Sequence, residues 1–282
     1  MISIKDYLCE ADAVLIGAGA GLSAAAGLDY AGAAFQEAFG DMISRYGFTD
    51  LYTSSFYPFR SEEERWAYWS RHVAFARIDP SALPLYRRLR ELVEGKDHFV
   101  ITTNVDGQFR KAGFAADRLF EVQGDYAYIQ PQRGTDGRRF YAEDLFMRMV
   151  REQHDCRIPS ELVPYYYQGE IRLGDRRGEV MDINIRKDAG FVQDDQWDAQ
   201  AARYQQFVER HQGHRLLLLE LGIGFNTPTI IRFPFERMAR QLPCATLVRV
   251  NRDYPETSLP GLKRFRAFTD FAAFGENATE IK

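Results

Sequence analysis

The chain has 282 residues, of which 45% are hydrophobic and 27% are charged, and this composition is typical of a soluble globular protein with one or two domains. Its formal net charge of −4 provides no general attraction to nucleic acid or anionic lipid, so we expect neither nucleic acid nor a membrane as a partner. The three cysteines, Cys9, Cys156 and Cys244, lie far apart in the sequence, which favours a reducing, cytoplasmic location and excludes a zinc site built from four cysteines.

The first predicted elements are an amphipathic helix over residues 4–11 and a buried strand over residues 13–16. A glycine-rich turn and a second helix over residues 22–26 follow directly. Strand, glycine turn and helix in this order are typical of a nucleotide-binding unit, in which the backbone approaches a pyrophosphate and the helix offers free N–H groups. The alternative is a tight turn that only packs the helix against the strand. The apolar stretch 13–28 is interrupted by glycines and is shorter than the about 20 residues of a membrane span.

Residues 30–94 are rich in aromatic side chains and predict two helices near their end. The first covers residues 61–77, with Ser61 as its N-cap and three acidic residues in its first turn. Its aromatic and aliphatic stripe predicts core packing rather than a cofactor site. The second helix covers residues 81–94 and follows Pro80.

Four further strands are predicted over residues 98–103, 119–123, 216–221 and 245–250. Each is a nearly continuous apolar run, the pattern of strands buried on both faces of a parallel sheet. Residues 125–199 contain no such run, so we interpret them as an insertion. The predicted fold is therefore α/β, a Rossmann-like parallel sheet with a smaller, discontinuous inserted domain. We expect residues 1–29, 95–124 and 200–282 to form the larger domain, and residues 30–94 and 125–199 to form the smaller one.

Polar residues and glycines follow these strands, at the edge where open α/β sheets bind ligands. Asn104 and Asp106 follow the strand 98–103, and Asn251 follows the strand 245–250. Gly222, Gly224 and Asn226 follow the strand 216–221. An Asn-x-Asp turn is also common as a simple turn or helix cap. Together, however, these groups on one sheet edge predict a ligand site.

Four segments in this order resemble the sirtuin family: GAGLSAAAG from Gly19, TTNVDGQFRKAG from Thr102, LGIGFNTP from Leu221 and VRVN from Val248. The resemblance implies NAD as co-substrate and cleavage of the bond between nicotinamide and ribose. It also implies that Asp106 binds the carboxamide of nicotinamide and that Asn104 contacts the adjoining ribose. The remaining residues that it implies for NAD are Gly17 as a turn residue, Gly19, Ala20, Gly21 and Ser23 for the phosphates, Gly222, Gly224 and Asn251 for the adenosine half, and Asn226 as a further cofactor-binding residue.

Three departures from the sirtuin pattern matter. Gln123 stands where sirtuins carry a histidine that relays a proton, and glutamine cannot accept a proton near neutral pH. The two Cys-x-x-Cys pairs of the zinc module are missing, so we expect no metal, and residues 28–32 replace a Pro-Asp-Phe-Arg segment. Together the departures resemble the macrodomain-linked class M sirtuins. That resemblance implies protein ADP-ribosylation in a stress response, a link to a macrodomain hydrolase, and a lipoyl-bearing acceptor of the glycine-cleavage type.

The sequence therefore predicts an NAD-dependent protein ADP-ribosyltransferase, with Asn104 and Gln123 as its catalytic residues. Loss of a catalytic base costs about 10²–10⁴-fold in rate, and it penalises deacylation more than transfer to a side chain that brings its own reactivity. The alternatives are an NAD-dependent lysine deacylase with another base, an NAD glycohydrolase and a non-catalytic NAD sensor. None of the five histidines occupies the expected base position, and we expect structural or surface roles for them.

Overall fold

The computed structural model describes residues 3–274, and its larger part is built on a parallel sheet. The strand order is β11-β10-β9-β1-β2-β3, and all neighbours run parallel. The strands are β1 (Ala13–Ala18), β2 (Asp97–Thr102), β3 (Leu119–Glu121), β9 (Leu216–Leu221), β10 (Thr246–Val250) and β11 (Phe265–Phe268). Every residue of β1 and β9 is buried, as the apolar runs predict for strands covered on both faces.

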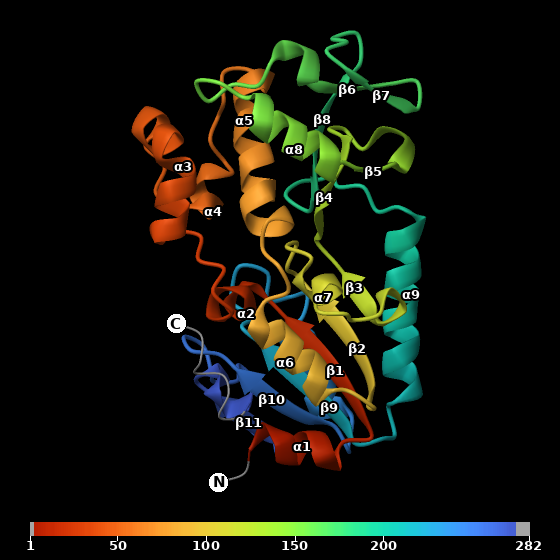
Figure 1. Cartoon of the computed structure of the whole chain (residues 1–282). Coiled ribbons are helices and arrows are strands. Elements are labelled where there is room, and N and C mark those ends of the chain that lie inside the picture. Colours follow the sequence, from red (N-terminus) through yellow and green to blue (C-terminus); the bar gives the residue numbers. More distant parts are fainter. Residues whose placement is uncertain (1–2, 275–282) are drawn as a thin grey trace.

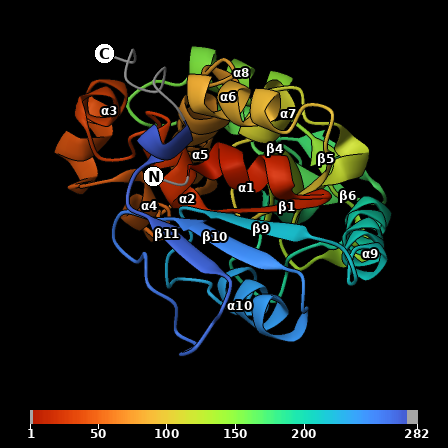
Figure 2. The same ribbon diagram turned by 90° about the horizontal axis from the view of Figure 1, so that it is seen from below.

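Helices cover both faces of this sheet. One face packs against α1 (Ile4–Glu10), α2 (Ala20–Ala25), α6 (Pro84–Leu92) and α7 (Gln108–Lys111). The other face packs against α9 (Asp195–Arg210) and α10 (Arg232–Gln241). Figure 2 shows α10 on one side of the sheet and α1 and α6 on the other. The predicted α/β, Rossmann-like class is confirmed, and each strand predicted from an apolar run is present.

The smaller part contains an antiparallel sheet in the order β5-β4-β8-β6-β7, at the top of Figure 1. Its strands are β4 (Gly124–Pro131), β5 (Phe140–Tyr141), β6 (Pro164–Tyr167), β7 (Glu170–Leu173) and β8 (Glu179–Ile185). The helices beside it are α3 (Ala33–Tyr46), α4 (Leu51–Ser54), α5 (Glu62–Val73) and α8 (Glu143–Glu152). Residues 125–199 thus hold no parallel strand, as expected for an insertion.

Aromatic side chains form the core of this smaller part. Trp66 of α5 lies beside Phe146 of α8, and Tyr68 contacts Phe39 of α3. The Ser61 side chain accepts a hydrogen bond from the Glu64 N–H, so the predicted N-cap of α5 is confirmed. Beyond Val73 the helix widens into a π-helical turn, η1 (Ala74–Ile78). In residues 3–274 no group of histidine, cysteine and acidic side chains is arranged to hold a metal ion.

Two helices cross the boundaries that the sequence predicts for the domains. The sequence places the helix α6 in the smaller domain, but Leu85, Tyr86 and Leu89 pack against the parallel sheet with Val100. The helix α9 begins at Asp195, within the range assigned to the smaller domain, and its Phe207 also packs against the parallel sheet. An amphipathic helix packs on any apolar face within reach, so its sequence position alone does not fix its domain.

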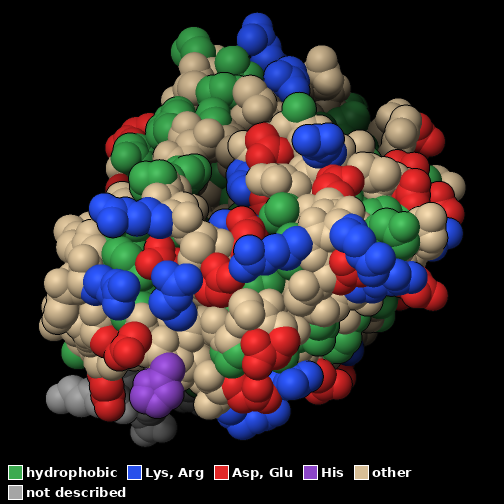
Figure 3. Space-filling model, turned by 90° about the horizontal axis from the view of Figure 1, so that it is seen from above, with side chains coloured by type: hydrophobic (Ala, Val, Ile, Leu, Met, Phe, Trp, Pro, Cys, Tyr) green, Lys and Arg blue, Asp and Glu red, His purple; other side chains and the backbone are tan. Residues whose placement is uncertain are grey.

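The described part of the chain has no helix that is both long enough and apolar enough to cross a bilayer. Its other small elements are short 3₁₀ turns, η2 (Ala116–Arg118), η3 (Thr135–Gly137), η4 (Ser160–Leu162) and η5 (Phe271–Phe274). On the face shown in Figure 3, acidic and basic side chains are interspersed, without a large field of either sign.

Candidate functional site

The predicted site residues follow five strand ends that lie side by side. The strand register pairs Ala18 of β1 with Thr102 of β2 and with Leu221 of β9. It also pairs Thr102 with Glu121 of β3, and Leu221 with Val250 of β10. The sheet therefore brings the loops that follow β1, β2, β3, β9 and β10 to one edge, as predicted.

Asn104 is buried at this edge, and its side-chain nitrogen is bonded entirely to the protein. The Nδ2 atom lies 3.0 Å from the main-chain oxygen of Gly19, 3.1 Å from Ser23 Oγ and 3.1 Å from Tyr86 Oη. A carboxamide nitrogen only donates hydrogen bonds, and the carbonyl of Gly19 only accepts them, so the orientation of the amide is fixed. Asn104 therefore offers its Oδ1 atom, an acceptor, to a bound molecule.

Asp106 is buried and shares Ser23 Oγ with Asn104 as a hydrogen-bond partner. Ser23 Oγ donates to Asp106 Oδ2 over 2.5 Å, and the Gln108 N–H donates to Oδ1 over 3.0 Å. Burial raises the pKa of Asp106, while these two hydrogen bonds act in the opposite direction. The structure places the Ser23 hydroxyl in this network, so its contact with a phosphate stays a prediction.

The glycines of the loop after β1 pack closely against other backbone or side chains. Gly17 lies inside β1, where a Cβ atom would approach Ile231, the residue directly before α10, to 2.5 Å. A Cβ atom on Gly21 would lie 2.8 Å from the Cα of Gly222, which itself has a φ of +62°. The tight-turn alternative therefore explains Gly17, Gly21 and Gly222 in part. Ala20 is exposed beside this contact and is accessible to a ligand.

The loops after β9 and β10 are joined by Asn251. Its Nδ2 donates to the Ile223 oxygen over 2.7 Å, and its Oδ1 accepts from the Tyr254 N–H over 3.0 Å. Asn251 thus supports the loop that contains Gly224 and Asn226, both of which are exposed. A Cβ atom on Gly224 would meet no other atom within 4 Å, so this loop is open on that side.

Gln123 lies in the turn between β3 and β4, at the same level of the sheet as Asn104. Thr102 pairs with Glu121, and Asn104 and Gln123 each follow their paired residue by two positions. Gln123 is half-buried, and its main-chain oxygen accepts a hydrogen bond from the Arg186 N–H over 3.0 Å. The two predicted catalytic residues therefore follow the ends of neighbouring strands.

Sequence reasoning missed three groups at this edge, Tyr86, Arg77 and Asp125. The Arg77 Nε atom lies 2.8 Å from Asp125 Oδ1, and its Nη1 lies 3.1 Å from Glu143. Gly107, with a φ of +65°, lies against the Arg77 guanidinium. The glycine directly after Asp106 was the available signal, since it permits this close approach. Nothing in the π-helical segment pointed to Arg77.

A buried histidine, His72, lies beneath the aromatic side chains of the smaller part. Its Nδ1 is 2.9 Å from Tyr68 Oη, and the Tyr68 hydroxyl donates to the Leu51 oxygen over 2.9 Å. The single hydroxyl proton is thus used, so Nδ1 carries the imidazole hydrogen. Burial lowers the pKa of His72 to about 3, which keeps it neutral at pH 7. Its place among aromatic rings agrees with the structural role expected for the histidines.

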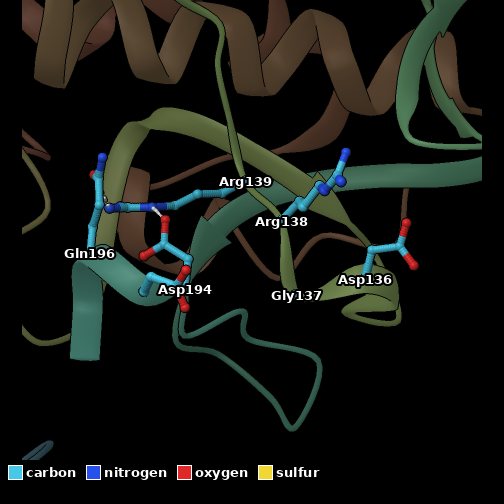
Figure 4. Close-up of a pocket in the computed structure, with 7 residues that line it drawn as sticks. Asp136, Gly137, Arg138, Arg139, Asp194 and Gln196 are labelled. Atoms are coloured by element: carbon cyan, nitrogen blue, oxygen red, sulfur yellow. Dashed lines mark hydrogen bonds and ion pairs between the residues drawn. The ribbon is translucent and has the colours of Figure 1, made fainter. Parts of the chain in front are cut away.

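A separate shallow pocket lies at the start of α9 and contains none of the predicted site residues (Figure 4). Arg139 Nε lies 2.7 Å from Asp194 Oδ2, and its Nη2 donates to Gln196 over 3.1 Å. The guanidinium of Arg139 also lies over the Tyr128 ring, with its Cζ atom 4.4 Å from the ring centre. Because the Arg139 guanidinium is already bonded to Asp194 and Gln196, we do not assign it a role in holding a ligand in this pocket. The strand edge remains the candidate site.

Comparisons with known proteins give a consistent result, although no family model matches the chain. It is 37% identical over 250 residues to a protein ADP-ribosyltransferase from Staphylococcus aureus (strain Mu50 / ATCC 700699), covering 88% of this chain and 77% of that protein. It is 32% identical over 275 residues to a probable bifunctional ADP-ribose hydrolase/ADP-ribosyltransferase from Fusarium oxysporum f. sp. cubense, covering 91% of this chain and 43% of that protein. Sirtuins share its fold. Among them is a Sir2 homologue in complex with NAD, with 15% identity, a TM-score of 0.55 and coverage of 93% of this chain and 86% of the other.

Proposed function

The chain belongs to the sirtuin-type protein ADP-ribosyltransferases, enzymes that use NAD as co-substrate, and we propose that its reaction takes place at the strand edge that carries Asn104 and Gln123. The observation that supports this location most directly is the orientation of the Asn104 amide. Three protein acceptors surround its nitrogen, and its oxygen is the atom left for a ligand.

The chemistry of the donor set fits NAD. We propose that Asn104 Oδ1 accepts a hydrogen bond from a hydroxyl of the nicotinamide ribose, and that Asp106 accepts one from the carboxamide. Both contacts pair an acceptor of the protein with a donor of the co-substrate. The remaining residues proposed to hold NAD are Gly17, Gly19, Ala20 and Gly21 on the phosphate side, Gly222, Gly224 and Asn251 on the adenosine side, and Asn226. Ser23, whose hydroxyl hydrogen is used by Asp106, would act on the phosphate side by fixing the loop after β1.

In the proposed reaction, the bond between nicotinamide and ribose C1′ breaks, and C1′ forms a bond to a nucleophilic atom of the acceptor protein. Nicotinamide leaves as a neutral molecule, and the proton of the nucleophile passes to solvent. Asn104 and Gln123 position the ribose and take up no proton. This supports transfer over deacylation, because deacylation draws on a base at the position of Gln123.

For the acceptor, we propose a lipoyl-bearing carrier protein of the glycine-cleavage type. The support is the resemblance to class M sirtuins, which rests on Gln123 and on the missing Cys-x-x-Cys pairs. The name of the fungal relative joins an ADP-ribose hydrolase to an ADP-ribosyltransferase, which supports a functional link between this chain and a macrodomain-type hydrolase.

The test is to incubate the chain with NAD labelled in its adenylate half and with a carrier protein, either lipoylated or not. The expected result is labelled carrier, with nicotinamide released in equal amount. Asn104→Ala is expected to abolish both signals, and full activity of this variant would reject the role of Asn104. Nicotinamide release without labelled carrier would instead identify a glycohydrolase, and O-acyl-ADP-ribose from an acylated peptide would identify a deacylase.

A further inference from the structure

Tyr86 places a single polar atom at the candidate site from within an apolar core. It lies on α6 and is fully buried among the residues that cover the parallel sheet. Its ring packs edge to face against the Phe109 ring, with 5.0 Å between the ring centres. Its hydroxyl lies 2.7 Å from Ser23 Oγ and 3.1 Å from Asn104 Nδ2. A buried hydroxyl with two such partners is satisfied as both donor and acceptor.

The direction of these hydrogen bonds follows from the chemistry of their ends. With Asp106 ionised, its carboxylate only accepts, so the one hydrogen of Ser23 Oγ points to Asp106 Oδ2. The hydrogen between Tyr86 and Ser23 must then come from Tyr86. The two hydrogens of Asn104 Nδ2 are shared among Gly19, Ser23 and Tyr86, and because this nitrogen cannot accept, its hydrogen bond with Tyr86 runs from Asn104 to the tyrosine oxygen. The reverse direction would point the Tyr86 hydrogen at a nitrogen that cannot accept it.

We infer that Tyr86 is a positioning residue that couples Asp106 to Asn104 through this directed chain of hydrogen bonds. Bonds that run in one direction polarise one another, so the Asp106 carboxylate strengthens each donor along the chain. The consequence is a fixed Asn104 amide whose Oδ1 faces the ribose. The inference rests on the proposed function, since it assumes that Asn104 contacts the co-substrate.

The experiment measures kcat and KM for NAD in Tyr86→Phe, with nicotinamide release as the signal. The variant keeps the ring that packs against Phe109, and thermal unfolding checks that it is folded. A neutral hydrogen bond contributes about 0.5–1.5 kcal/mol, so kcat is expected to fall about two- to thirteenfold. We expect the KM for NAD, and its Kd by calorimetry without an acceptor, to change less than about twofold, because most contacts to NAD are made elsewhere.

A double-mutant cycle separates coupling from a merely structural effect. In Ser23→Ala the chain is already broken, so adding Tyr86→Phe is expected to lower kcat no further. Tyr204→Phe is the matched control, because Tyr204 is a half-buried tyrosine on the opposite face of the sheet, packed near Phe99. It is expected to leave kcat unchanged in both backgrounds.

Three results would overturn the role of Tyr86. They are an unchanged kcat in Tyr86→Phe, the same fold-loss in the wild-type and Ser23→Ala backgrounds, and a loss confined to the Kd for NAD, which would mean that Tyr86 serves binding alone. If the wild-type chain releases no nicotinamide in the presence of acceptor, the proposed function itself fails. These outcomes are distinguishable because the wild-type activity is measured first.

Discussion

Arg249 and Glu220 form a fully buried ion pair across neighbouring strands of the parallel sheet, with 2.7 Å between Nε and Oε1. Arg249 Nη2 also lies 2.8 Å from Glu236 of α10, and Arg232 lies 3.6 Å from Glu220. Arg232 donates in turn to the main-chain oxygens of Tyr254 and Glu256. The buried ion-pair network is thus connected by hydrogen bonds to the loop that follows β10 and holds it in place.

Arg249→Met is expected to destabilise the fold by about 3–5 kcal/mol, because it leaves the Glu220 carboxylate buried beside fewer cations. Equilibrium unfolding in urea measures this loss. Arg252→Met is the matched control, since Arg252 pairs with Asp253 on the surface and its removal is expected to cause no measurable change. Equal stability of the Arg249→Met and wild-type proteins would contradict the assigned role of the ion pair.

Gly107→Ala is expected to destabilise the protein more than Gly113→Ala. Both glycines have positive φ, +65° and +85°, so both substitutions cost about 1–2 kcal/mol in backbone strain. Only at Gly107 would the new methyl group collide with the guanidinium of Arg77, which is held by Asp125 and Glu143. Urea unfolding of the two variants compares them directly. If Gly113→Ala instead lowers the free energy of unfolding more than Gly107→Ala does, the Arg77 side chain moves away from the new methyl group without a loss of stability.

Acid is expected to destabilise the protein in part through His72. Its pKa is about 3 in the folded chain, against about 6.5 in an unfolded one, so the unfolded state binds more protons between these values. Stability therefore falls as pH drops below about 6.5, by about 2 kcal/mol at pH 5 for this group alone. His72→Gln is expected to lose that much less stability than the wild type between pH 7 and pH 5. Identical pH dependence in urea unfolding would exclude the effect.

Gln123→His is expected to increase the yield of O-acyl-ADP-ribose from an acylated lysine peptide, because the imidazole supplies the missing base near neutral pH. Gln123→Asn is the control, since it keeps an amide and adds no base. Mass spectrometry of the two reaction mixtures measures the product. The explanation by a lost base is weakened if both variants yield the same amount.

The strands of the parallel sheet were predictable because burial on both faces leaves an unmistakable apolar run, as in residues 216–221. Even there the apolar pattern gave no sign that Glu220 is paired inside the sheet with Arg232 and Arg249, which come from other elements. The antiparallel sheet was not predicted strand by strand. Its short strands are rich in aromatic and charged residues whose pairing depends on distant segments.

The position of Asn104 and Asp106 at the sheet edge was predictable, because both residues directly follow a strand. Tyr86 was not, because a tyrosine on the apolar face of an amphipathic helix is typical of ordinary core packing, and its hydroxyl partners come from two other segments. The glycines were identified, but their tight contacts were not. A glycine's position in the sequence does not tell whether a ligand or another backbone lies beside it.

The contact of Gly21 with Gly222 also limits how this enzyme can be redesigned. Backbone atoms of the two loops are in direct contact there. A side chain in place of Gly21 or of Gly222 would therefore force the loop after β1 and the loop after β9 apart. If NAD binds at this edge as proposed, substitutions that admit a larger dinucleotide analogue belong at Ala20 and Gly224, which are exposed.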